Sequence, residues 1–297
     1  MLSVFFLLVF LLEVTVSNAS GATDAIFKGT LDVHSLVLLS TIYDSSHENK
    51  LKSMNHILKR NLELFDEIHL LVQEDYSKER WVELFPVVAD ESIHLVHVAT
   101  PEFHRNKAWR HFNSSAYLYQ DFFKYANDHL SDKLVVLTNN DIEFPPYAPD
   151  MFIEFWQPDT GLVVTRQEAP CGGKSQTPNQ FCKWGNIPKS YDVFVFKPPL
   201  LQDVIDQTNF PQNFKGAENS AAFVLHNAGK LEMYNLCEYM DVWHHHCHRN
   251  WTAFLELPHL CKIYTPYKKT CWNPAKIQQS KTVSKRGGEN YVDSMKL

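Results

Sequence analysis

The sequence lacks the short motifs that identify several large enzyme classes. It contains no Gly-x-Ser-x-Gly, no Walker-type phosphate loop and no Gly-x-Gly-x-x-Gly. These absences argue against serine hydrolases, P-loop nucleotide hydrolases and dinucleotide-binding enzymes. A His-Glu-x-x-His helix is also missing, so a zinc hydrolase that depends on such a helix fits poorly.

An excess of positive charge is absent too. The 28 basic and 34 acidic residues leave a formal net charge of −6, which argues against a nucleic-acid binder that acts through bulk charge. The chain also contains a single long apolar run, at residues 2–12 (LSVFFLLVFLL). A membrane-spanning helix needs roughly 20 apolar residues, so we expect no stable membrane span.

The apolar run at residues 2–12 suits the core of a secretory signal peptide, because small residues follow it up to Ala22. We therefore predict a signal peptide at residues 1–20 and a location in the secretory pathway: the ER or Golgi lumen, or outside the cell. An uncleaved signal anchor is the alternative.

Cysteine is missing from the first half of the chain, and all six cysteines lie at or after Cys171. An even number behind a signal peptide predicts disulfides, with Cys171 and Cys182 as the first candidate pair. A zinc site that includes His244–His248 is the alternative, although the cysteine spacings match no zinc-finger pattern. Two Asn-x-Ser/Thr sequences, at Asn113 and Asn250, predict a glycoprotein.

The order of apolar segments predicts an α/β fold. A strand at 35–43, an amphipathic helix at 48–64 and a strand at 67–73 form a β-α-β unit, which implies a parallel sheet with a right-handed crossover. Ser45 and Glu48 have capping-box spacing at the start of that helix. Further helices are predicted at 116–129 and at 217–228, the latter with Gly229 as its C-cap. We expect a single domain at residues 30–274 and a disordered basic tail at 275–297.

The central stretch is KLVVLTNNDIEF, at residues 133–144. Its apolar residues 134–137 predict a strand buried on both faces, and the polar step Thr138-Asn139-Asn140-Asp141 follows at once. Because open α/β sheets bind ligands at the carboxyl ends of their strands, Asp141 is the first candidate for chemistry. The alternative is an ordinary turn, since Asn-Asn-Asp favours turns.

Four motifs follow one another in a fixed order, and together they resemble the GT-A glycosyltransferases. The motifs are LKRNL at 58–62 with IHLLVQE at 68–74, the aromatic helix before the Asn-Asn-Asp-Ile step, SYDVFVF at 190–196, and GAEN at 216–219 before a histidine-rich strand. The resemblance covers roughly residues 35–250. It implies a Rossmann-like, mixed and mostly parallel sheet, and a glycosyltransferase that uses a nucleotide-diphosphate sugar and a glycan or glycoprotein acceptor.

The resemblance also implies a divalent metal that bridges the diphosphate. Asp141 would be one ligand, and His246 or else His244 would complete the site. An imidazole ligand favours Mn²⁺ over Mg²⁺. Asn139 stands where the family has the first acid of Asp-x-Asp. This departure supports an alternative function, a secreted protein that binds glycans or nucleotide sugars on the same fold without catalysis.

The remaining candidate residues would contact substrates. The resemblance implies that Glu218 and Asp192 act near the acceptor, and that Asn139, Asn140 and Asn219 contact the substrate. From charge alone, Arg105 and Lys107 could clamp the diphosphate, or they could belong to a solvated basic loop. The alternative for Glu218 is a structural role, in which its charge stabilises the start of its helix. The alternative for Asp192 is that it begins a strand and has no role in catalysis.

Overall fold

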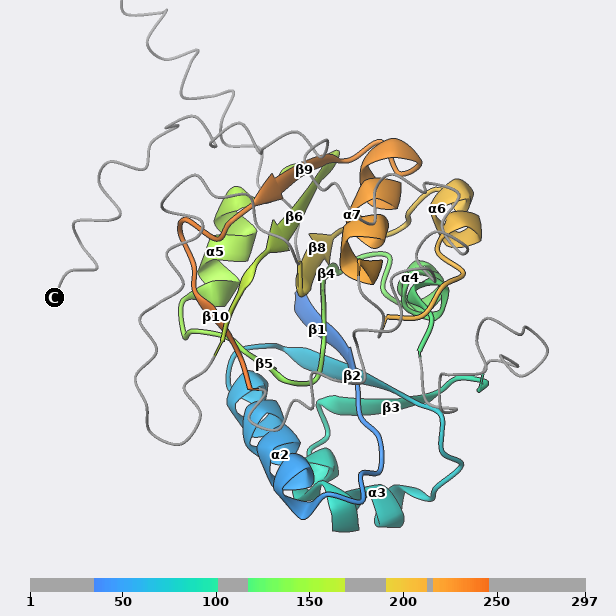
Figure 1. Ribbon diagram of the computed structural model, residues 1–297, viewed down its shortest axis with the longest axis vertical. Coiled ribbons are helices and arrows are strands. Elements are labelled where there is room, and N and C mark those ends of the chain that lie inside the picture. Colours follow the sequence, from blue (N-terminus) through green and yellow to red (C-terminus); the bar gives the residue numbers. More distant parts are fainter. Residues whose placement is uncertain (1–34, 101–116, 169–190, 213–215, 246–297) are drawn as a thin grey trace, which may run out of the picture. The chain divides into compact units, whose positions relative to one another are not determined.

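A computed structural model describes residues 35–100, 117–168, 191–212 and 216–245 of the chain (Figure 1). These ranges all belong to the compact unit Ser35–Leu297, which is distinct from Met1–His34. No helix within them is both long and apolar enough to cross a membrane. Several predictions lie outside them and stay predictions: the signal peptide, the basic tail, the sequons at Asn113 and Asn250, Arg105, Lys107 and His246.

The centre of the fold is a seven-stranded sheet with the order β3-β2-β1-β4-β8-β6-β9. The strands are β1 (Leu36–Thr41), β2 (Glu67–Val72), β3 (Ile93–His97), β4 (Leu134–Thr138), β6 (Thr160–Val164), β8 (Val193–Phe196) and β9 (Glu232–Asn235). Neighbouring strands are parallel except that β8 runs antiparallel to both β4 and β6. The mixed, mostly parallel sheet that the sequence predicted is therefore confirmed.

Helices flank this sheet (Figure 1). On one face lie α4 (Tyr119–His129), α6 (Gln202–Gln207) and α7 (Ala217–Asn227), which share a core with alternate residues of β1 and β4 such as Val37, Leu39 and Leu137. Across the sheet lie α2 (Glu48–Leu62), α3 (Lys78–Leu84) and the short 3₁₀ helix η1 (Pro86–Ala89). Since both faces are covered, β1 and β4 are buried at every residue, as continuous apolar runs predict.

A second, three-stranded sheet has the order β5-β10-β7. Its strands are β5 (Ile142–Glu143), β10 (Val242–His244) and β7 (Arg166–Glu168). β5 follows β4 and β7 follows β6, so this small sheet continues from two strands of the large one. β10 pairs antiparallel with β5 and parallel with β7. Between β5 and β6 lies α5 (Ala148–Phe155), whose Phe152 packs edge-on against Phe144.

The cap of one predicted helix and the start of another differ from the structure. The N-cap of α2 is His47 and makes no side-chain capping bond, while Ser45 instead accepts a hydrogen bond from the His47 amide, so the capping-box prediction was wrong. The helix predicted from residue 116 begins at Tyr119. Leu118 forms an isolated bridge with Pro211, and the Tyr119 amide donates to Phe210 O at 3.0 Å, so these extended residues are held by tertiary contacts.

The end of α7 also differs from the prediction. Its C-cap is Ala228, and the left-handed residue that follows is Lys230, with φ of 59°. Gly229 is required for a different reason. A β-carbon at this position would lie 2.4 Å from the carbonyl oxygen of Leu225, so only glycine allows the chain to pass this close to the helix.

Cys237 follows β9 and is buried and disulfide-bonded. It is the one cysteine within the described ranges, and the other five lie outside them. The predicted pair Cys171 and Cys182 lies outside them as well and stays a prediction.

Candidate functional site

The candidate site lies at the carboxyl edge of the large sheet, where β1 and β4 end. The chain adds β2 and β3 on one side of β1 and then returns to place β4 on the other side. The boundary between β1 and β4 is therefore a topological switch point, and open α/β sheets bind their ligands in the crevice at such points. Asp141 lies three residues beyond Thr138, the last residue of β4, as the sequence predicted.

The antiparallel direction of β8 brings Asp192 to the same edge. Asp192 directly precedes the first residue of β8, and that residue, Val193, pairs with Thr138 at the end of β4. The Thr138 hydroxyl donates to Asp192 O at 2.9 Å, and the side-chain Nδ2 of Asn139 donates to Asp192 Oδ1 at 3.4 Å. A residue at the start of one strand thus meets residues at the end of its neighbour.

Asp192 is buried and paired with Arg166, the first residue of β7. Arg166 Nη1 donates to Asp192 Oδ1, and the Asp192 side chain has no exposed surface. Burial raises the pKa of the Asp192 carboxyl, while the nearby charges of Arg166 and His244 act in the opposite direction. Because the guanidinium is permanently charged, the pair stabilises the carboxylate inside the protein.

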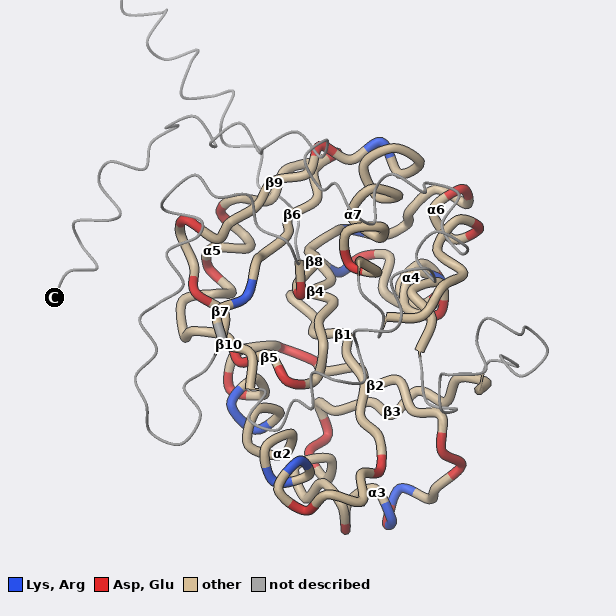
Figure 2. Tube along the Cα trace, in the orientation of Figure 1, with Lys and Arg blue, Asp and Glu red and all other residues tan. Residues whose placement is uncertain are grey.

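Asp141 is joined to His244 of β10. Their closest atoms, Asp141 Oδ2 and His244 Nε2, are 3.2 Å apart, and the His245 amide donates to the backbone oxygen of Asp141 at 2.9 Å. The Asp141 side chain keeps 17% of its surface exposed, whereas that of His244 keeps 2%. Of the two carboxylates at this edge, Asp141 is therefore the accessible one and Asp192 the buried one. His244 is the buried imidazole that orients Asp141. Figure 2 shows acidic segments near β4 and β5 beside the basic segment of β7.

The side chain of His245 contacts a different carboxylate. Its Nε2 lies 2.8 Å from Glu143 Oε2, and Arg60 of α2 approaches the other oxygen of Glu143 at 3.7 Å. His244 and His245 thus contact different carboxylates. His246, which the sequence predicts on the face of His244, lies outside the described ranges.

Asn61 of α2 braces the segment that follows Asp141. Its Nδ2 donates to Ile142 O at 2.9 Å, and its Oδ1 accepts from the Phe144 amide at 3.3 Å. The residue is only 3% exposed. The physical role of Asn61 is therefore to satisfy these two backbone groups around β5. Asn61 belongs to the LKRNL motif at residues 58–62.

The first turn of α7 brings Glu218 towards this edge. Gly216 is the N-cap of α7 and has φ of 90°, a conformation that favours glycine. Burial raises the pKa of Tyr119, and the negative charges of Glu218 and Asp192 raise it further, so both carboxylates lie near this tyrosine. Glu218 is half-buried and Asn219 is buried.

The structure therefore brings Asp141, Asp192, His244 and Asn139 together. Asn140 is half-buried, and its Nδ2 has no hydrogen-bond partner within the described part of the chain. Sequence reasoning did not single out Arg166 or Glu143. The one local signal for Arg166 is a cation two residues after the end of an apolar strand.

The residues at the edge fit a divalent cation in part. A carboxylate oxygen and an imidazole nitrogen converge at Asp141 and His244, and this donor set suits Mn²⁺. Cations that bridge phosphates commonly take few protein ligands, since phosphate oxygens and water complete the coordination. The pairing of Asp192 with Arg166 leaves the cluster less negative than two free carboxylates would make it.

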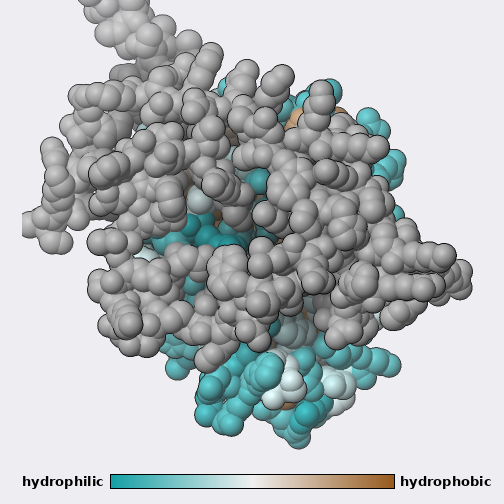
Figure 3. All heavy atoms as spheres, in the orientation of Figure 1, coloured by the Kyte–Doolittle hydropathy of each residue, from teal (hydrophilic) through white to brown (hydrophobic). Residues whose placement is uncertain are grey.

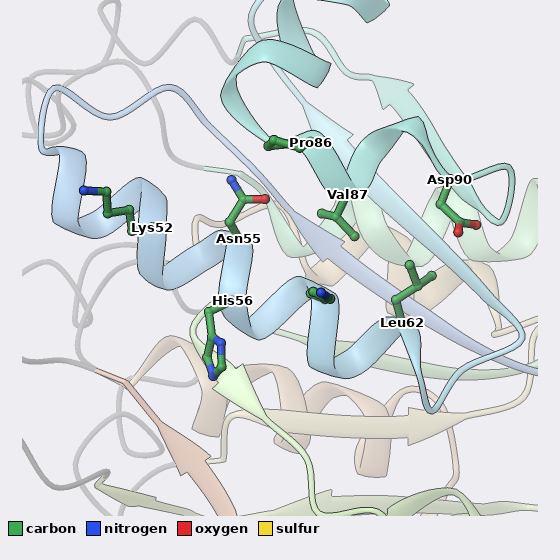
Figure 4. Close-up of a pocket in the computed structure, with 8 residues that line it drawn as sticks. Lys52, Asn55, His56, Leu62, Pro86, Val87 and Asp90 are labelled. Carbon is green, nitrogen blue, oxygen red and sulfur yellow. The ribbon is translucent and has the colours of Figure 1, made fainter.

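A cavity of about 610 Å³ lies elsewhere, between α2 and η1 (Figure 4). Lys52, His56 and Leu62 line it from the helix, and Pro86, Val87 and Asp90 line it from the opposite side. The surface of α2 and α3 is mainly hydrophilic in the view of Figure 3. None of the residues at the carboxyl edge described above lines this cavity.

The mixed, mostly parallel sheet with helices on both faces makes this an α/β protein. No protein-family model matches the sequence, and no curated protein matches it. Solved structures with a similar fold include S. aureus TarS residues 1–349 in complex with UDP-GlcNAc (13% identity, TM-score 0.48, covering 77% of this chain and 65% of that chain). Another is the mannosyltransferase PcManGT from Pyrobaculum calidifontis in complex with GDP-Man and Mn²⁺ (15% identity, TM-score 0.42, covering 73% of this chain and 57% of that chain).

A third similar structure is 4-diphosphocytidyl-2C-methyl-D-erythritol synthase from Anaerococcus prevotii (10% identity, TM-score 0.36, covering 68% of this chain and 86% of that chain). The chain thus spans less than two thirds of the TarS fragment and of the mannosyltransferase.

Proposed function

We propose that this protein transfers a glycosyl group from a nucleotide-diphosphate sugar to a glycan or protein acceptor. The observation that carries the proposal is the Asp141–His244 pair at the topological switch point of the sheet. The pair offers an accessible carboxylate and an imidazole at the place where such sheets bind nucleotides.

Asp141 and His244 would hold the divalent cation, with His246 as the further ligand that the sequence predicts. Mn²⁺ is the preferred ion and Mg²⁺ the alternative. When bound, the ion stabilises the negative charge that develops on the leaving diphosphate. Asn139 and Asn140 supply amide groups beside this position, and Arg105 and Lys107 remain proposed contacts of the diphosphate.

The transfer breaks the bond between the sugar's anomeric carbon and the diphosphate oxygen, and forms a bond from that carbon to the acceptor. The acceptor loses a proton, which requires a base. Glu218 is the better candidate because its side chain is half-buried at a helix start, whereas the Asp192 carboxylate is fully buried against Arg166. Asp192 would then hold Arg166 and Asn139 in position, and Asn219 would support the start of α7.

A second candidate function is favoured by the reduced charge of the cluster. Asn139 replaces an acid of the family motif, and Arg166 neutralises Asp192. A binding protein that recognises a glycan or nucleotide sugar without transferring it fits these two features. The secretory pathway is the proposed location for either function.

Thermal unfolding of the purified protein with UDP- and GDP-sugars, with and without MnCl₂, tests the proposal. A ligand at a hundred times its Kd stabilises the native state by about 2.7 kcal/mol, which a thermal shift detects. We expect a shift only with a nucleotide sugar and Mn²⁺ together. The shift should be lost in Asp141→Asn but kept in the control Asp128→Asn, an exposed acid on α4.

Three outcomes separate the alternatives. Absence of any shift with Mn²⁺ present would contradict the transferase and a protein that binds nucleotide sugars, and would leave only a protein that binds glycans. Binding that survives EDTA and Asp141→Asn, without turnover of the sugar nucleotide, supports the binding protein. Release of nucleoside diphosphate that depends on Asp141 supports the transferase.

A further inference from the structure

A separate cluster of metal-binding side chains lies at the other end of the sheet. Glu67 is the first residue of β2, His69 is the third, and His94 of β3 is the register partner of His69. Strands rise about 3.3 Å per residue, so the start of β2 lies roughly 17 Å from its carboxyl end. This cluster is therefore distinct from the edge that holds Asp141. It is the one group of three or more metal-binding side chains found among the described residues.

The donor atoms of the three residues converge. His69 Nε2 lies 3.2 Å from Glu67 Oε2, and His94 Nε2 lies 4.0 Å from the same oxygen. All three donor atoms lie within 4.8 Å of one another. Donors around a tetrahedral zinc ion stand about 3.3 Å apart, since each lies about 2.0–2.1 Å from the metal. Small side-chain rotations would close the observed triangle to that size.

Neighbouring groups already orient two of the donors. His69 Nδ1 forms a hydrogen bond of 2.8 Å with the Tyr125 hydroxyl of α4, which turns Nε2 towards Glu67. Hydrogen bonds of this kind fix the ring orientation of histidine ligands in metal sites. Lys133 donates to Glu67 Oε1 at 2.8 Å, so the other oxygen, Oε2, faces the two imidazoles.

The cluster is also open to solvent on one side. The His69 side chain is 8% exposed, whereas those of Glu67 and His94 are 31% and 46% exposed. An ion can therefore reach the donors without opening the core, and water can complete its coordination. The stacked rings of His69 and His94, with centroids 4.6 Å apart, hold both imidazoles on one side of the carboxylate.

We propose that Glu67, His69 and His94 form a binding site for a divalent transition-metal ion, with Zn²⁺ as the ion that fits best. Two imidazoles and one carboxylate with an open fourth position are a ligand set that zinc accepts. The ion joins β2 to β3, and through His69 and Tyr125 it is linked to α4. Because the ion binds the native state, it raises stability there.

Zinc binding to variants of the full chain tests this site. The protein is stripped with EDTA, dialysed and titrated with ZnCl₂, and bound zinc and the thermal midpoint are measured. His94→Ala and Glu67→Gln should each raise the Kd of one equivalent of bound zinc by at least about tenfold, because each removes a ligand. The zinc-dependent rise in the thermal midpoint should disappear with them.

The matched control is His97→Ala, an exposed histidine three residues further along β3. It should bind zinc as the wild type does, and Asp141→Asn, which changes the other site, should keep the zinc equivalent that His94→Ala and Glu67→Gln weaken. Circular dichroism of the metal-free variants shows whether they are folded. The proposal is wrong if His94→Ala and Glu67→Gln are folded and bind the same number of zinc ions with the same affinity as His97→Ala.

Discussion

Replacement of Asn61 by alanine tests whether α2 holds the segment beyond Asp141 in place. The wild-type side chain satisfies two backbone groups, Ile142 O and Phe144 N, and both residues are buried. Alanine can satisfy neither, and β5 lies too deep for water to replace the amide freely. We therefore expect Asn61→Ala to lower the free energy of unfolding substantially.

The magnitude follows from the groups left without partners. A buried donor or acceptor that loses its partner costs about 1–3 kcal/mol, so two such groups cost about 2–6 kcal/mol. Alanine stabilises the helix by up to about 0.7 kcal/mol relative to asparagine, through its higher helix propensity. The net loss should be about 1–5 kcal/mol.

Asn55→Ala is the matched control, because Asn55 lies on the same helix and makes a single bond, from its Nδ2 to Leu84 O at 2.9 Å. Loss of one such bond costs about 0.5–1.5 kcal/mol, and the propensity gain is the same. Urea unfolding followed by circular dichroism measures both variants. If Asn61→Ala costs no more than Asn55→Ala, Asn61 does not brace the site.

Three further outcomes are expected. Arg166→Met should lower the free energy of unfolding in urea by about 3–5 kcal/mol, because it removes the cation that pairs with the buried Asp192 carboxylate. Adding Asp192→Asn should recover part of the loss. Hydrogen bonding from Lys133 lowers the pKa of Glu67 below its ordinary value of 4.5, so this pair stabilises the protein above pH 4.5 and its contribution disappears as pH falls through the lowered pKa. The difference in thermal midpoint between wild type and Lys133→Met should therefore shrink on acidification; an unchanged difference at low pH would contradict this. Gly216→Ala forces a side chain into a left-handed conformation at the start of α7 and should cost about 1–2 kcal/mol in urea unfolding, whereas no loss would show that the turn relaxes.

The strands of the large sheet could be predicted because their residues are apolar in continuous runs. β4 is the clearest case, since all of its residues are buried, and its run also placed Asp141 correctly at a carboxyl end. The amphipathic spacing of α2 predicted that helix to within two residues of its end. In these elements, burial on a face of the sheet leaves a pattern that the sequence itself carries.

The small sheet could not be predicted from such patterns. β5 and β10 are two and three residues long, and their partners are distant: His244 pairs with Ile142. Arg166 meets Asp192 only because β8 runs antiparallel, which places the start of one strand beside the end of another. Pairing of this kind depends on the topology of the whole sheet, so the sequence around Arg166 does not identify Asp192 as its partner.

The division of the site between two sheets has a consequence for its affinity. Asp141 follows a strand of the large, buried sheet, whereas His244 belongs to a short sheet that can open locally at lower cost. Any ligand that needs both residues binds only while the short sheet is closed. Its apparent Kd is then the intrinsic Kd divided by the closed fraction. Hydrogen exchange at the His245 amide, which donates to Asp141 O, would report that fraction directly.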